Sequence, residues 1–199
     1  MTRRFLALLL CLLPFATLAA GPTETLDPGQ VLRGRFVQER HLQGFTAPLK
    51  TEGHFILAPG KGLIWRAEKP FAVTTVMTPT GLVQQVGGAE TMRLASARLP
   101  FLSRLYDMLG GALAGDWRSL DGDFTVARSG DSKAWQVTLT PRQGTDPLTM
   151  PFQAITAKGG RFVDAVRIAK PDGDADDLTF LDQDLSSIPL AAEDAAALK

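Results

Sequence analysis

The residues that could perform chemistry in this chain are few and scattered. His41 and His54 are its two histidines, and neither has a carboxylate or cysteine at the spacing of a metal site. The sequence contains no nucleophile elbow, phosphate-binding loop or HExxH zinc motif. An enzyme needs several titratable groups in one place, so we expect no catalytic residue, no metal and no cofactor. Both histidines are expected on the surface or in loops.

Two charged groups could have a binding role. The acidic run 172–177 could hold calcium through its oxygens, but it lacks the remaining ligands of an EF-hand loop. An exposed hairpin turn explains this run better. Four arginines could form a basic rim on a sheet: Arg33, Arg35, Arg40 and Arg66. A solvated strand face is the favoured explanation of these arginines, and a docking surface for an anionic head group or a partner protein is the alternative.

Residues 1–20 are predicted to be a cleavable secretory signal peptide. Arg3 and Arg4 form its basic region, an apolar core follows, and small residues precede Gly21. Lipidation at Cys11 is an alternative, but Leu10 stands where a lipoprotein signal needs a small residue. Without Cys11 the mature chain has no cysteine, so it must fold without disulfides.

Length and charge limit the remaining classes. The 199 residues are enough for one domain, which we expect to cover residues 21–199. The chain has 21 basic and 21 acidic residues, and removal of Arg3 and Arg4 leaves a slight negative excess. This balance argues against nucleic acid as a partner. No later apolar run approaches membrane-spanning length, and we expect an exported monomer.

Residues 53–70 predict two strands joined by a turn. The apolar runs 55–57 and 63–65 are rich in aromatic and β-branched residues, and a Pro-Gly-Lys-Gly segment separates them. Because side chains alternate along a strand, each strand presents one set of residues to one face. We expect a concave apolar wall that includes Gly53, Phe55, Leu57, Leu63, Trp65 and Ala67.

Similar short runs separated by turns continue along the chain and predict an antiparallel all-β sheet. The predicted strands are residues 30–39, 53–57, 63–67, 71–77, 82–86, 124–127, 135–140, 153–157, 163–169 and 178–181. Residues 99–114 instead have apolar side chains at helical spacing, with Pro100 near the start and two glycines near the end. They predict one amphipathic helix. The tail from Pro189 is predicted to be frayed.

These motifs, in this order, resemble the outer-membrane lipoprotein carrier (LolA) family. The resemblance rests on Gly34-Arg35-Phe36-Val37-Gln38, Gly53-His54-Phe55, the Pro59 turn, Trp65 and Lys69-Pro70. Further along, residues 99–102 resemble the start of a lid helix, Asp116-Trp117 a loop, and residues 162–168 a late strand.

The resemblance implies a mainly β fold, with a strongly twisted antiparallel sheet curled into an incomplete (half) barrel. Short α-helices would form a lid over a hydrophobic cavity. The implied function is a periplasmic carrier that binds the acyl chains of a lipidated cargo and shuttles it towards the outer membrane of a Gram-negative envelope. An inner-membrane transporter would be the donor and an outer-membrane receptor the acceptor. The implied cavity residues are Leu32, Phe36, Phe55, Leu57, Leu63, Trp65, Phe101, Leu102, Leu105 and Leu109.

Two features depart from the family pattern. Ala58 precedes the turn proline, where the family has its lid-gating arginine, and the Pro-rich residues 21–29 replace its N-terminal helix. The cargo could therefore be another lipid, such as a glycolipid or a lipid-linked pigment delivered to a dedicated exporter. A non-carrying envelope protein that binds protein partners through the same sheet is the alternative from another class.

Overall fold

The computed structural model describes residues 26–96, 122, 124–142, 144 and 151–199. This part of the chain is built almost entirely of β-strands, with one short helix near its C-terminus. The elements are β1 (Val31–His41), β2 (Leu49–Ala58), β3 (Gly62–Lys69), β4 (Val73–Thr78), β5 (Gly81–Val86), β6 (Ala89–Ala95), β7 (Phe124–Gly130), β8 (Trp135–Pro141), β9 (Ala154–Gly159), β10 (Val163–Ala169), β11 (Ala175–Ser186) and α2 (Ala192–Ala197).

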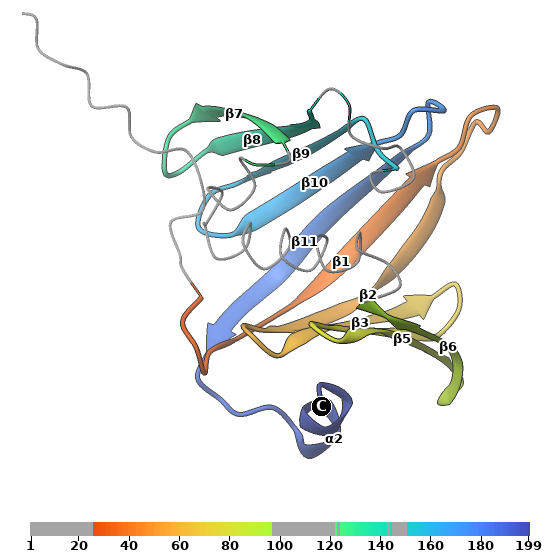
Figure 1. Ribbon diagram of the computed structural model, residues 1–199, viewed down its shortest axis with the longest axis vertical. Coiled ribbons are helices and arrows are strands. Elements are labelled where there is room, and N and C mark those ends of the chain that lie inside the picture. The colour runs from red at the N-terminus through yellow and green to blue at the C-terminus, as the bar shows by residue number, and fades with distance from the viewer. Residues whose placement is uncertain (1–25, 97–121, 123, 143, 145–150) are drawn as a thin grey trace, which may run out of the picture.

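All eleven strands form one antiparallel sheet in the order β6-β5-β4-β3-β2-β1-β11-β10-β9-β8-β7. The first and last strands, β1 and β11, pair at its centre. All other neighbouring strands in the sheet are consecutive in the sequence. The sheet does not close, because β6 and β7 remain at its two edges. Both ends of the sheet bend to the same side in Figure 1, and α2 lies outside the curl. The predicted mainly β, incomplete barrel is therefore confirmed.

The register divides the sheet into two faces. Leu32 of β1 pairs with Leu57 of β2, which in turn pairs with Leu63 of β3, so these side chains lie on one face. We call it the inner face, and the face that α2 covers is the outer face. Because side chains alternate along a strand, Ile56 and Ile64 belong to the outer face.

Three hydrophobic clusters lie on these faces. One covers the inner side of β7 to β10 around Trp135 and Val137, and a second covers the inner side of β1 to β3 around Leu32 and Phe55. Phe180 of β11 packs against both clusters and so connects them. The third lies on the outer face and contains Val31, Ile56, Ala58, Ile64, Val76 and Leu198.

The prediction of a frayed tail is wrong. Helix α2 is only six residues long, too short to be stable alone, but two contacts hold it against the outer face. Leu198 is buried against β3 at Gly62, where an added Cβ would lie 2.7 Å from the leucine Cδ2. Asp194 is buried and accepts a 2.6 Å hydrogen bond from Nη2 of Arg66. Long-range contacts therefore order a segment that is rich in the helix former alanine but too short to form a stable helix alone.

Two further differences concern strands. Strand β6, which pairs with β5, was not predicted, since its residues are mostly exposed and do not alternate. The run 172–177 is not one exposed turn, because β11 begins at Ala175 and Asp176 is 5% exposed. Only its first part, near Gly173, forms the turn. The predicted helix at 99–114 lies outside the described residues.

Candidate functional site

The structure brings together the predicted cavity residues that it describes. Six of the ten lie on the inner face of three adjacent strands: Leu32 and Phe36 on β1, Phe55 and Leu57 on β2, and Leu63 and Trp65 on β3. Trp65 is partly exposed and the other five are buried. The remaining four, Phe101, Leu102, Leu105 and Leu109, lie outside the described residues. The six form a continuous apolar surface.

Two glycines lie on the inner face beside the aromatic rings. Phe36 pairs with Gly53 of β2, and its ring stacks on that of Trp65 in β3 with centroids 3.7 Å apart. A Cβ at position 53 would lie 1.9 Å from the backbone carbonyl oxygen of Arg66, so Gly53 allows the β2 and β3 backbones to approach closely. Gly34 makes room for Phe55, whose ring atom Cε1 would lie 2.7 Å from a Cβ at position 34. The glycines of the resemblance thus have a steric role here.

Phe180 extends this surface across the centre of the sheet. Its ring meets Phe55 edge to face at 5.4 Å and Trp65 at 6.2 Å between centroids, geometries that aromatic pairs favour. We call Phe36, Phe55, Trp65 and Phe180 the aromatic wall. Phe180 was predicted to lie in a strand but not in the wall. Its pairing with Phe36 across the β1–β11 ladder joins residues far apart in the sequence, so no local pattern revealed it.

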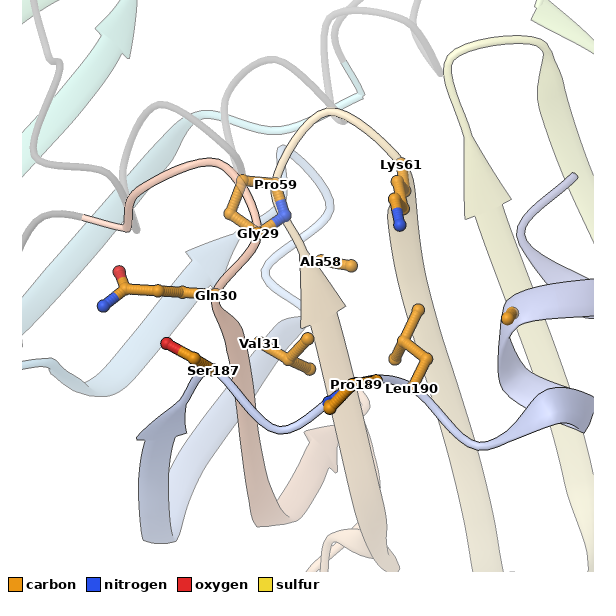
Figure 2. Close-up of a pocket in the computed structure, with 10 residues that line it drawn as sticks. Gly29, Gln30, Val31, Ala58, Pro59, Lys61, Ser187, Pro189 and Leu190 are labelled. Atoms are coloured by element: carbon orange, nitrogen blue, oxygen red, sulfur yellow. The ribbon is translucent and has the colours of Figure 1, made fainter.

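Two pockets lined by described residues lie away from the aromatic wall. A pocket of about 390 Å³ lies beside the β7–β8 turn, around Gly130 and Lys158. Another, of about 280 Å³, lies on the outer face where the ends of β1 and β2 meet residues 187–190 (Figure 2). Neither contains a predicted cavity residue. Ala58 lines the second pocket and is 3% exposed in the outer cluster, so its side chain lies away from the aromatic wall.

The histidines lie on the outer face, half-exposed and beside carboxylates. Nδ1 of His54 is 2.9 Å from Oε1 of Glu68, and Nε2 of His41 is 3.2 Å from Oδ2 of Asp177. Within the part of the chain that the structure describes, no group of three or more His, Cys, Asp or Glu side chains is arranged to hold a metal ion. The two histidines therefore each lie beside one carboxylate on the outer face.

The four arginines do not form one basic rim. Arg33 donates hydrogen bonds to Ser186 and to backbone carbonyls at 188 and 189, and Arg66 binds Asp194. Nη1 of Arg35 lies 3.8 Å from the Asp182 carboxylate. Arg40 alternates onto the inner face with Phe36, whereas Arg33 and Arg35 alternate onto the outer face. Each arginine thus has its own partner within the chain.

A polar cluster lies at one end of the inner face. Asp176 accepts hydrogen bonds from Arg40 Nε at 2.7 Å and from Gln38 Nε2 at 3.0 Å, and its other oxygen is 2.9 Å from Lys170 Nζ. Burial of Asp176 opposes its ionisation, but the hydrogen bonds from Arg40, Lys170 and Gln38 outweigh burial and hold the pKa of this carboxyl below its usual value. Asp176 is therefore a carboxylate at neutral pH.

The described residues form an open half barrel whose inner face is lined by packed aromatic and apolar side chains, of which Trp65 and Phe180 are partly exposed. The chain belongs to the family described as outer membrane lipoprotein carrier protein LolA-like, whose model matches residues 23–156. The description of this family is that of lipoprotein carrier proteins. No curated protein matches the sequence.

Several solved structures are similar to this chain at low identity. A LolA superfamily protein from Nitrosomonas europaea is 11% identical with a TM-score of 0.45, and the match covers 84% of this chain and 90% of that one. A structure of the MucA/MucB complex of Pseudomonas aeruginosa is 15% identical with a TM-score of 0.47, and the match covers 86% of this chain and 58% of that one. A putative outer membrane lipoprotein-sorting protein domain from Vibrio parahaemolyticus is 9% identical with a TM-score of 0.43, and the match covers 87% of this chain and 94% of that one. These similarities are distant, and none of them carries a function to this chain.

Proposed function

We propose that this protein is a periplasmic carrier that holds the acyl chains of a lipidated cargo against the inner face of its sheet. The aromatic wall supports this proposal most directly. Four large rings from four adjacent strands meet on this face. Family membership supports the same class of ligand.

Such a surface matches the physical difficulty of moving a lipid through water. Each methylene transferred from an apolar environment to water costs about 0.8 kcal/mol, so a long acyl chain does not leave a membrane unescorted at a useful rate. An apolar surface offsets this cost for any acyl chain, because the hydrophobic effect is non-directional. Ligand orientation must then come from polar groups at the margin.

The proposal includes the expected route of the cargo. Residues 1–20 would direct export and be removed, and residues 21–199 would act as a monomeric single domain. The cargo would pass from an inner-membrane transporter to an outer-membrane receptor, with Phe101, Leu102, Leu105 and Leu109 closing over it as a lid. None of the helices in the described part of the chain is long and apolar enough to cross a membrane.

The proposal is tested by organic extraction and mass spectrometry of the protein purified from its native periplasm, together with titration by brominated fatty acids. Bromine quenches a nearby indole, so we expect co-purified lipid and strong quenching that decreases in Trp65→Phe. This variant keeps an aromatic ring on the wall while removing its reporter. In the predicted lid, Leu105→Asp should weaken the binding of the brominated fatty acids.

Recovery of no lipid, with no quenching by any brominated chain, would contradict the carrier proposal. That result would favour an envelope protein that uses the sheet to bind protein partners. Recovery of a glycolipid or a lipid-linked pigment would keep the carrier proposal and replace the lipoprotein cargo.

A further inference from the structure

The polar cluster of Gln38, Arg40, Asp176 and Lys170 lies on the same face as the aromatic wall. Along β1, Phe36, Gln38 and Arg40 alternate onto the inner face, and along β11 Phe180, Leu178 and Asp176 do the same. Among the residues that the β1–β2 and β1–β11 registers place on this face, the charged ones are Arg40 and Asp176. Lys170 follows directly after β10, two residues beyond inner-face Ile168. The apolar surface therefore ends at one polar margin.

The charges of this cluster are not balanced. Within it, Arg40 and Lys170 are two cations facing one carboxylate, while the carboxylates of Asp172 and Asp174 in the adjoining turn accept hydrogen bonds from the backbone N–H groups of Asp174 and Gln43. The side chain of Asp176 is only 7% exposed, whereas those of Lys170 and Arg40 are 27% and 47% exposed. The carboxylate thus lies beneath, and the two cations face outward.

Arg40 also keeps donors available. Its Nε binds Asp176, while its two terminal nitrogens make no hydrogen bond with the described residues. A guanidinium edge of this kind binds planar or tetrahedral oxyanions well. The buried carboxylate holds both cations in place, so they need little further ordering when an anion arrives.

We propose that this cluster binds the anionic head group of the ligand, a phosphate or carboxylate, while the acyl chain lies along the aromatic wall. This inference rests on the proposed carrier function and adds to it the charge and the orientation of the ligand. An amphiphile would place its charged end at β1, β10 and β11 and its tail towards β3.

The test compares two ligands with one chain length and different head groups. A neutral fluorescent acyl amide is displaced by monododecyl phosphate or by 1-dodecanol, and the ratio of the two affinities is the readout. We expect the wild type to prefer the phosphate by about tenfold, as one additional charge-assisted hydrogen-bonding contact would give. Lys170→Gln should lower this ratio by about three- to tenfold, and Lys170→Arg should restore it.

Arg167→Gln is the matched control. Arg167 lies on the opposite face of β10 and pairs with Asp177, which also contacts His41. Both glutamine variants therefore remove one cation from a carboxylate that keeps a second basic partner. The control should leave the ratio within about twofold of wild type. If Lys170→Gln fails to fold, Arg40→Gln supplies the same comparison.

An equal affinity for both ligands in the wild type would overturn this inference and leave the carrier function intact. So would an equal loss of preference in Lys170→Gln and Arg167→Gln. Displacement by neither ligand would overturn the carrier function, and this inference with it. Inorganic phosphate in millimolar excess distinguishes the two sources of anion. If inorganic phosphate weakens the binding of dodecyl phosphate but not that of dodecanol, the site also binds the free ion. If inorganic phosphate weakens neither, the site binds the head group only when its acyl chain is bound as well.

Discussion

Replacement of Gly34 by alanine should destabilise the protein through Phe55. A Cβ at position 34 would lie 2.7 and 2.9 Å from two ring atoms of Phe55 and 3.0 Å from the carbonyl oxygen of Leu181. The ring is 2% exposed and meets Phe180 edge to face, so it cannot move away freely. Overpacking of this kind costs about 1–3 kcal/mol, and the lower entropy of the unfolded chain offsets about 0.4–1 kcal/mol of it. We expect a net loss of about 1–2 kcal/mol.

Urea unfolding followed by tryptophan fluorescence measures this loss, and a double-mutant cycle assigns it. Phe55→Leu removes both ring atoms that the new methyl would meet, so the two substitutions should couple favourably by about 1 kcal/mol. Gly122→Ala is the control, because a Cβ at position 122 meets no atom within 4 Å. Its effect should stay within about 0.5 kcal/mol. If Gly34→Ala is as mild as this control, or if its cost is unchanged beside Phe55→Leu, the steric explanation is wrong.

Two further predictions concern the tail and the polar cluster. Leu198→Ala should lower the free energy of unfolding by about 2 kcal/mol, because it empties a buried position on the outer face, whereas Ile188→Ala should change it by less than about 0.5 kcal/mol at a position 67% exposed. Equal losses of unfolding free energy in Leu198→Ala and Ile188→Ala, measured by urea unfolding, would contradict the docking of α2 on the outer face. Since the pKa of native Asp176 is below its unfolded value, its ionised form stabilises the fold at neutral pH. That contribution disappears as the pH falls from the unfolded pKa through the lower native pKa. The stability advantage of wild type over Asp176→Asn should therefore narrow between neutral and acidic pH in urea titrations, and a constant difference would refute this assignment.

Most of the sheet could be predicted because its strands carry local signals. Alternation in β1 and the apolar runs of β2 and β3 predicted which residues share a face within each strand. The family resemblance then implied one common cavity face for Leu32, Phe55 and Leu63, and the structure places these three residues on one face. Turn residues between the runs marked the hairpins. The family resemblance then supplied the curvature, which alternation alone does not specify.

The missed features depend on partners far along the chain. From the sequence, Asp176 was predicted to lie in an acidic turn, but in the structure it binds Arg40, which is 136 residues away. Asp194 was predicted to lie in a frayed tail, but it binds Arg66, which is 128 residues away. Neither pairing follows from composition or periodicity, because the register that creates it belongs to the assembled sheet. The same holds for Phe180 in the aromatic wall.

The apolar runs of β2 and β3 carry information about both faces of the sheet. A strand with only one covered face alternates apolar and polar residues, whereas a strand covered on both faces is apolar throughout. In β3, Leu63 belongs to the inner cluster and Ile64 to the outer cluster, which the C-terminal segment covers through Leu190 and Leu198. The outer apolar residues are thus accounted for by the protein's own tail. In the aromatic wall on the inner face, Trp65 and Phe180 are partly exposed, and the tail residues Leu190 and Leu198 pack on the opposite face. The tail therefore does not compete with the proposed cargo for the inner face.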